Sequence, residues 1–424
     1  MSNSNSQGNY WKTTWLIAAI IGFYYITVII FSYNFPISDD FALLEFVTNI
    51  VTSSDLTKSL GLLYTQHNEH IIITTKLVYL LDYWLFDEIN FKRLILIGNI
   101  FHLGTFYIFI KHSPKNFKQQ HYLFIFSACM IFQFGSAESM LWSMAAISNY
   151  LVIMLALLTL SLLSTDDFIH YILAILMCVL AVFTQGNGIL IPFIATFYLI
   201  SQKRYRDSFA MTIIGLLVVF IYFKDYLVPE THSNPLDTLH NLGKILIFAL
   251  SFTGSAFGVG GGIQYPILTT LSLIPTLAVG SLIWTITGYG FYKKIYSNGN
   301  IFIWFNVFVV LTSIITAMSR INFGLSQSMV FRYHIYSNLA IISTAMLILQ
   351  LLPIKQYKDY VLERNFKFLA ICSAAYLVAT FVFVPYFYFI VYSQIRHGGI
   401  IYPDKEQALM ILENAKKSDV FTVH

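Results

Sequence analysis

Long apolar blocks recur along almost the whole chain, from Trp11 to Tyr392, and polar residues gather between them. A bilayer core about 30 Å thick needs roughly 20 mostly apolar residues of helix to cross it. The pattern therefore predicts an all-α polytopic membrane protein with about 11 transmembrane helices. The expected spans are 13–33, 92–110, 121–135, 146–164, 168–183, 188–201, 207–223, 266–290, 300–317, 330–352 and 367–392.

One apolar segment, 243–258, ends in a glycine-rich run and does not fit this alternation of spans. A span there would move Lys293 and Lys294 to the outer side, so we expect a re-entrant or interfacial piece. Residues 1–392 then form a single transmembrane domain. Residues 393–424 form a short extracytoplasmic tail, in which the stripe Ala408, Leu409 and Leu412 predicts an amphipathic helix.

Composition agrees with this interpretation, since 57% of the 424 residues are hydrophobic and 11% are charged. An ordinary soluble domain carries about 25% charged residues. The composition therefore excludes a soluble enzyme, a nucleic-acid-binding protein and a disordered scaffold. Lysine and arginine concentrate in short loops that share one side of the membrane, which predicts a cytoplasmic N-terminus and an outer C-terminus.

The longest expected outer loop, 34–91, is acidic and holds eight of the 21 acidic residues against two lysines. Helical spacing of apolar residues over 43–51 and 73–84 predicts two interfacial helices, and Lys76 and Asp82 make the second unsuitable as a span. Asp39 and Asp40 directly follow the first span. Repulsion raises the pKa of one of two adjacent carboxylates, which suits a general base or a cation ligand. The alternative is a solvated pair that caps a helix.

A second polar cluster ends the same loop, and it consists of Gln66, His67, Asn68, Glu69 and His70. Its imidazoles, amides and carboxylate suit hydrogen bonding to a sugar or a phosphate. They also suit zinc or manganese, although no third, distant ligand can be identified. The remaining interpretation is a polar start of a helix, with His67 and His70 on one helix face.

Further polar groups lie at the outer ends of later spans, where they are costly and need a reason. They include Glu138 and Trp142 after the third span, Arg320 after the ninth, the triplet Arg332, Tyr333 and His334 before the tenth, and Gln185, Asn187, Lys224, Asp225 and His232 in other outer turns. Arginine is the side chain best suited to forked hydrogen bonds with phosphate. For Arg332 the alternatives are interfacial snorkelling and an ion pair with Glu138 or an aspartate.

Early acids and late arginines on one side suit transfer of a sugar from a phosphate-bearing lipid. A carboxylate would deprotonate the acceptor hydroxyl, and arginine would neutralise the leaving phosphate. The Asp39-Asp40 pair, the cluster 66–70, the turn with Glu138 and Trp142, and the late Arg-Tyr-His triplet resemble bacterial membrane glycosyltransferases of the GT-C class that use polyprenyl-phosphate sugars.

This resemblance implies roles for the residues named above. Asp39 would be the catalytic base with Asp40 in support, and Arg332 and Arg320 would bind the donor phosphate. The substrate-contacting residues implied are Gln66, His67, Asn68, Glu69, His70, Glu138, Trp142, Tyr333 and His334.

The resemblance also implies inverting transfer from a polyprenyl-phosphate donor to an extracytoplasmic glycan or lipid, as in O-antigen or lipopolysaccharide modification. The enzyme would lie among the lipids of the bacterial inner (cytoplasmic) membrane. No cofactor and no nucleic acid are expected, and a divalent cation is not favoured. Two other classes stay open: an O-antigen-type polymerase, and a transporter or flippase of lipid-linked sugars, which favours charges near the bilayer midplane.

Overall fold

The structure is a computed structural model that describes residues 3–114, 120–227, 239–260, 266–351, 359–396 and 404–422. Every regular element in these ranges is an α-helix or a 3-10 helix, which confirms the all-α prediction. Within the same ranges, eight helices are long and apolar enough to cross a membrane. The chain is therefore a multi-pass membrane protein.

These eight helices coincide with eight of the eleven predicted spans. They are α1 (Asn3–Phe31), α5 (Phe91–His112), α8 (Ser143–Leu163), α11 (Tyr205–Phe223), α14 (Pro266–Tyr292), α15 (Ile301–Arg320), α16 (His334–Leu351) and the joined pair α17 (Asp359–Thr380) and α18 (Phe383–Arg396). Of these helices, α8 lies deepest, with 83% of its most apolar stretch buried.

The other three predicted spans are shorter helices, namely α6 (Gln120–Ile131), α9 (Phe168–Val182) and α10 (Leu190–Ser201). They have 12, 15 and 12 residues. At 1.5 Å per residue such helices are about 18–23 Å long, less than the bilayer core. The number eleven therefore stays a prediction.

The segment predicted to be re-entrant contains α13 (Leu242–Thr253), which has 12 residues and is likewise too short to cross a bilayer. It packs against α14, α15 and α16. A Cβ atom on Gly280 of α14 would lie 2.0 Å from the carbonyl oxygen of Leu250, and one on Gly254 would lie 1.9 Å from that of Thr276. Glycine at these two positions lets the backbones of α13 and α14 approach closely.

The first loop forms three helices, α2 (Asp40–Thr52), α3 (Leu56–Tyr64) and α4 (Ile73–Phe86). The stripes over 43–51 and 73–84 correctly predicted α2 and α4. Lys76 and Asp82 of α4 are both buried, and both have partners. Lys76 Nζ donates to the carbonyl oxygens of Leu62 and Thr65 at 2.8 Å. Asp82 forms an ion pair with Arg93. These two charges therefore fix α4 to its neighbours instead of facing solvent.

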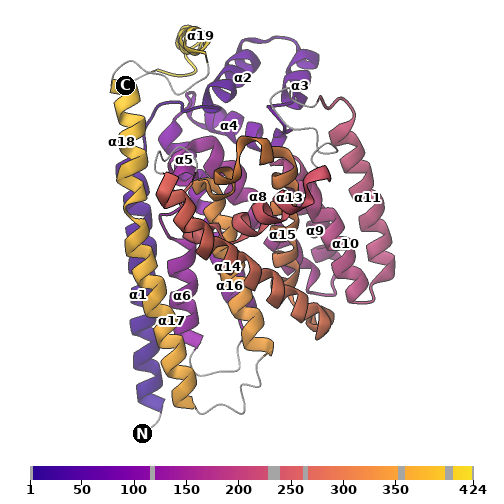
Figure 1. Ribbon diagram of the computed structural model, residues 1–424. Helices are drawn as coiled ribbons and strands as arrows, with labels where there is room; N and C mark the ends of the chain where they lie inside the picture. Colours follow the sequence, from indigo (N-terminus) through magenta and orange to yellow (C-terminus); the bar gives the residue numbers. More distant parts are fainter. Residues whose placement is uncertain are drawn as a thin grey trace.

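The C-terminal segment folds back onto this loop. Helix α19 (Lys405–Lys417) packs on α2 through Ala408, Ile411 and Ala415. The predicted stripe was wrong in part, since Leu409 is 50% exposed. Helix α18 ends at Arg396. Figure 1 shows α2, α3 and α19 at one end of the bundle and the N-terminus at the other. We call the end that carries α2, α3 and α4 the loop end.

Two contacts at the loop end join the C-terminal residues to the segment that leads into α5. The backbone N–H of Ile89 donates to the carbonyl oxygen of Val420 at 2.8 Å. The ring of Phe421 meets that of Phe91, at the start of α5, edge to face with centroids 5.2 Å apart.

Candidate active site

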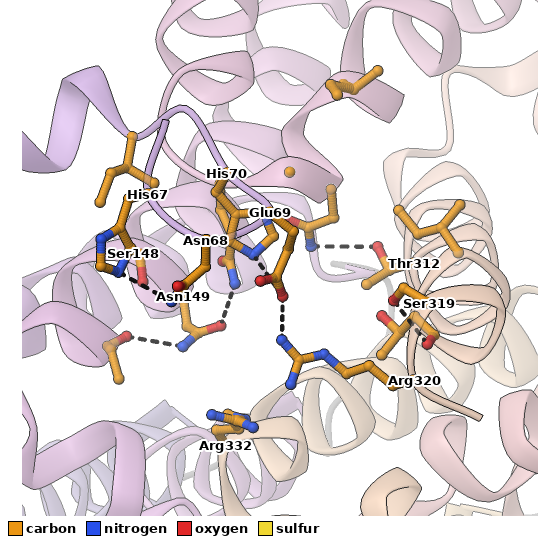
Figure 2. A pocket seen from close by; sticks show the side chains of 18 of the residues that line it. His67, Asn68, Glu69, His70, Ser148, Asn149, Thr312, Ser319, Arg320 and Arg332 are labelled. Atoms are coloured by element: carbon orange, nitrogen blue, oxygen red, sulfur yellow. Dashed lines mark hydrogen bonds and ion pairs between the residues drawn. The ribbon is translucent and has the colours of Figure 1, made fainter. Parts of the chain in front are cut away.

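A cavity of about 600 Å³ opens at the loop end of the bundle. Its wall combines Asp39 and residues 67–70 of the first loop with the starts of α8 and α16, the ends of α11 and α15, and the segment 185–190 between α9 and α10. Because successive helices run in opposite directions, polar residues near helix ends come together here from distant parts of the sequence. Figure 2 shows these side chains converging on one space.

The two adjacent aspartates have different environments. Asp40 is buried (1% exposed), and its Oδ1 accepts hydrogen bonds from Tyr79 Oη at 2.8 Å, Ser143 Oγ at 2.6 Å and the N–H of Met144 at 3.0 Å. Its Oδ2 accepts from the N–H of Ile37 at 3.2 Å. Asp40 therefore ties α2 to α4 and α8, and within the described residues it does not line the cavity.

Asp39 lines the cavity, with 31% of its side chain exposed. Asn68 Nδ2 donates to its Oδ1 at 3.4 Å, and His67 Nε2 lies 3.6 Å from the same atom. Burial acts to raise the pKa of Asp39, but His67, Asn68 and the charge of Arg332 outweigh it, so that the net pKa is lowered. Asp39 is therefore an ionised carboxylate at neutral pH.

The sequence-based reason for a raised carboxyl pKa was wrong. Burial, not repulsion between neighbours, raises the pKa of Asp40 to about 6, against the lowering effect of its hydrogen bonds. The raised pKa thus belongs to the aspartate that faces the protein interior.

Residues 67–70 form a tight turn, so the alternative in which His67 and His70 share a helix face was wrong. The N–H groups of His67 and His70 each donate to the other's carbonyl oxygen, at 2.7 and 2.8 Å. Asn68 occupies the left-handed region with φ of 48°, which asparagine tolerates better than most residues. The turn directs Asn68 toward Asp39 and Glu69 toward Arg320. Burial lowers the pKa of His70 to about 4, which keeps this imidazole neutral.

Both late arginines line the cavity and both have acidic partners. Arg320, at the end of α15, forms an ion pair with Glu69 (Figure 2). Arg332 lies in the 3-10 helix η7 (Phe331–Tyr333), with its Nη1 3.6 Å from Glu138 Oε1 of α7 (Ala137–Leu141). The pairing of Arg332 with Glu138, one of the alternatives from the sequence, is thus present. The Arg332 side chain also lines the cavity.

The remaining predicted residues divide into two groups. Trp142 and Tyr333 line the cavity, whereas Gln66, Glu138 and His334 are absent from its wall as far as the structure describes it. Gln66 Nε2 donates to the carbonyl oxygens of Asn68 and Leu227 at 2.6 Å and so supports the turn from behind. His334 is buried, with Nε2 3.3 Å from the carbonyl oxygen of Met329. Of the other outer residues, Lys224 and Asp225 are exposed outside the wall, and His232 lies outside the described residues.

Sequence reasoning gave no site role to a set of amides and hydroxyls in the cavity wall. These residues are Asn149, Gln185, Asn187, Thr312 and Tyr336. Asn149 carried a usable signal, because an amide inside an otherwise apolar span is costly and needs a partner. Thr312 and Tyr336 carried none, since both residue types are common in spans.

Among the described residues, no three His, Cys, Asp or Glu side chains gather as a metal site, and metal independence stays a prediction. No family model, curated protein or solved structure matches the chain. The assignment of a function therefore depends on the chemistry of the cavity.

Proposed function

We propose that the protein is a GT-C-like membrane glycosyltransferase that moves a sugar from a polyprenyl-phosphate donor to an extracytoplasmic glycan or lipid acceptor. The observation that carries the proposal is that an ionised carboxylate, Asp39, and two guanidinium groups, Arg320 and Arg332, line one cavity at the loop end. A base and a stabiliser of an anionic leaving group are the two elements that this reaction needs.

The reaction would be a single displacement with inversion. As the acceptor oxygen forms a bond to the anomeric carbon, its proton moves to the Asp39 carboxylate. The bond between the anomeric carbon and the phosphate oxygen breaks, and the electron pair leaves on polyprenyl phosphate. Arg320 and Arg332 stabilise the charge that develops there, each shifting from its glutamate partner toward the phosphate.

The apolar part of the cavity wall supports a lipid-linked donor. Ile189, Leu190, Phe223 and Ile315 line the cavity, and Phe223 and Ile315 are 48% and 37% exposed. An apolar lipid chain gains free energy by packing against such apolar side chains. A prenyl chain would therefore extend from the arginines between α11 and α15 into the membrane.

The test is Asp39→Asn, which keeps the size and hydrogen bonding of the side chain but removes the base. We expect transfer to fall at least about 100-fold, the usual contribution of general base catalysis. Thermal stability and membrane insertion should not change, because Asp39 is partly exposed. The effect is measured as the amount of sugar transferred from a polyprenyl-phosphate donor to surface glycan, detected by mass spectrometry.

Asp87→Asn is the matched control. Asp87 belongs to the same loop, is exposed and has φ of 56°, a conformation that asparagine also accepts. Full activity of Asp39→Asn would remove Asp39 as the base. A ladder of lengthened chains as the product would indicate a polymerase, and vesicle uptake without a covalent product would indicate a transporter.

A further inference from the structure

Both guanidinium groups in the cavity wall have a carboxylate partner, but the two carboxylates differ in position. Glu69, the partner of Arg320, itself lines the cavity. Glu138, the partner of Arg332, is not among the described residues of the wall. A phosphate that approaches Arg320 from the cavity therefore meets the Glu69 carboxylate as well.

The charges of the cavity wall balance. Apart from histidines, its described charged side chains are two carboxylates, Asp39 and Glu69, and two guanidinium groups, Arg320 and Arg332. A carboxylate next to a bound anion opposes its binding, because juxtaposed like charges repel, and they do so more strongly away from bulk water. The wall therefore attracts a phosphate less strongly than two unpaired arginines would.

Glu69 stays close to Arg320 when Arg320 turns to a ligand. His70 Nε2 lies 3.5 Å from Glu69 Oε1, and Figure 2 shows the carboxylate between His70 and Arg320. A Cβ atom on Gly186 would lie 2.7 Å from His70 Nδ1, so this imidazole packs directly against the segment between α9 and α10. Tyr226 Oη donates to the carbonyl oxygen of Glu69 at 3.4 Å. The turn is thus held in place, and the carboxylate remains within reach of Arg320.

The proposed reaction increases the negative charge that faces Glu69. A sugar phosphodiester carries one negative charge, whereas a phosphate monoester carries about 1.5 to 2 at neutral pH. Two guanidinium groups would therefore hold the lipid phosphate product more tightly than the donor, and slow release of the product would limit turnover. A carboxylate that competes for one arginine acts more strongly against the product than against the donor.

We propose that Glu69 is a competing anion that promotes release of the lipid phosphate product by re-forming its ion pair with Arg320. The inference rests on the proposed function and assigns one step, product release, to this residue. A purely structural ion pair predicts the opposite effect when the carboxylate is removed, because Arg320 would lose its support and bind phosphate less well.

Binding measurements on the full chain in lipid nanodiscs test this without requiring transfer. The probes are a short polyprenyl phosphate and its glucosyl ester. Glu69→Gln removes the charge at nearly constant size. It should tighten binding of the bare lipid phosphate about tenfold and that of the ester about threefold, because repulsion scales with the charge of the phosphate. Glu69→Asn also removes the charge and serves if Glu69→Gln does not fold.

Glu45→Gln is the matched control. Glu45 is exposed on α2 and does not line the cavity, so this variant removes the same charge from the loop end without touching the site. It should leave the affinity for both probes unchanged.

Turnover gives a second measurement. Tighter binding within one site is expressed mostly as slower dissociation. In Glu69→Gln the ratio of the first-turnover rate to the steady-state rate should therefore rise at least about threefold over the wild type, and Glu45→Gln should keep the wild-type ratio.

The outcomes separate the two proposals. Unchanged or weaker binding of the lipid phosphate to Glu69→Gln, equal tightening for both probes, or an unchanged ratio of rates overturns the role of Glu69 and leaves the proposed function intact. Failure of the wild type to bind either probe contradicts the proposed function, and the role of Glu69 falls with it.

Discussion

At the scale of residues, Asp39 and Asp40 are adjacent in the sequence, but one lines the cavity and the other is part of the protein interior. Asp39 faces the cavity and is held ionised by His67 and Asn68. Asp40 points into the protein and collects hydrogen bonds from Tyr79 and Ser143. Replacing Asp39 is therefore expected to have a different consequence from replacing Asp40.

We predict that Asp40→Ala destabilises the protein by about 3 kcal/mol, because it leaves buried donors on Tyr79 and Ser143 without their acceptor. Asp39→Ala should change stability little. Melting temperatures of the detergent-solubilised proteins measure the difference. Asp40→Asn keeps an acceptor oxygen and should recover part of the loss; equal melting temperatures for Asp39→Ala and Asp40→Ala would contradict the structural role of Asp40.

At the scale of elements, the packing of α13 on α14 depends on glycine. Gly254 and Gly280 meet the facing backbone so closely that a Cβ atom at either position would overlap a carbonyl group. Because α13 also packs on α15 and α16, which carry cavity residues, this contact supports one side of the site.

Gly280→Ala should therefore destabilise the protein by about 2 kcal/mol through overpacking against Leu250. Gly288→Ala is the control in the same helix, since a Cβ atom there would meet nothing within 4 Å, and it should be neutral or slightly stabilising. Thermal unfolding of the two variants gives the comparison. Similar losses in both would show that helix propensity, and not close approach, determines the effect.

The sequence predicted the helices better than the contacts between their side chains. Asp39 and Arg332 could be expected near one another, because both lie beside span ends on the same side. The ion pair of Glu69 with Arg320 could not, because it depends on the rotation of α15 relative to the turn 67–70. Asn149 was missed as a site residue because hydropathy averages hide one amide among apolar neighbours. The number of spans depends on where short helices end, which periodicity does not determine.

At the scale of the whole molecule, the C-terminal segment returns to the first loop at the loop end. Phe421 packs against Phe91 and Val420 bonds to Ile89, while α19 covers α2. Asp40 begins α2, so the C-terminal segment supports the part of the first loop that presents Asp39 to the cavity.

Phe421→Ala should destabilise this contact by about 3 kcal/mol, the usual cost of removing a buried phenylalanine ring. We expect faster proteolysis within the first loop and reduced transfer, although Phe421 does not line the cavity. Met410→Ala, on the exposed side of α19, is the control and should leave both unchanged. An intact first loop in Phe421→Ala would show that α19 is not needed to hold it.

The contact of α19 with α2 also has a consequence for biosynthesis. The first loop leaves the ribosome early, whereas residues 404–422 follow only after nearly all the apolar helices have been made and inserted. Until then α2 lacks the cover of Ala408, Ile411 and Ala415. A nascent chain therefore carries an unfinished first loop, and the loop end is completed only after translation has passed the last membrane helix.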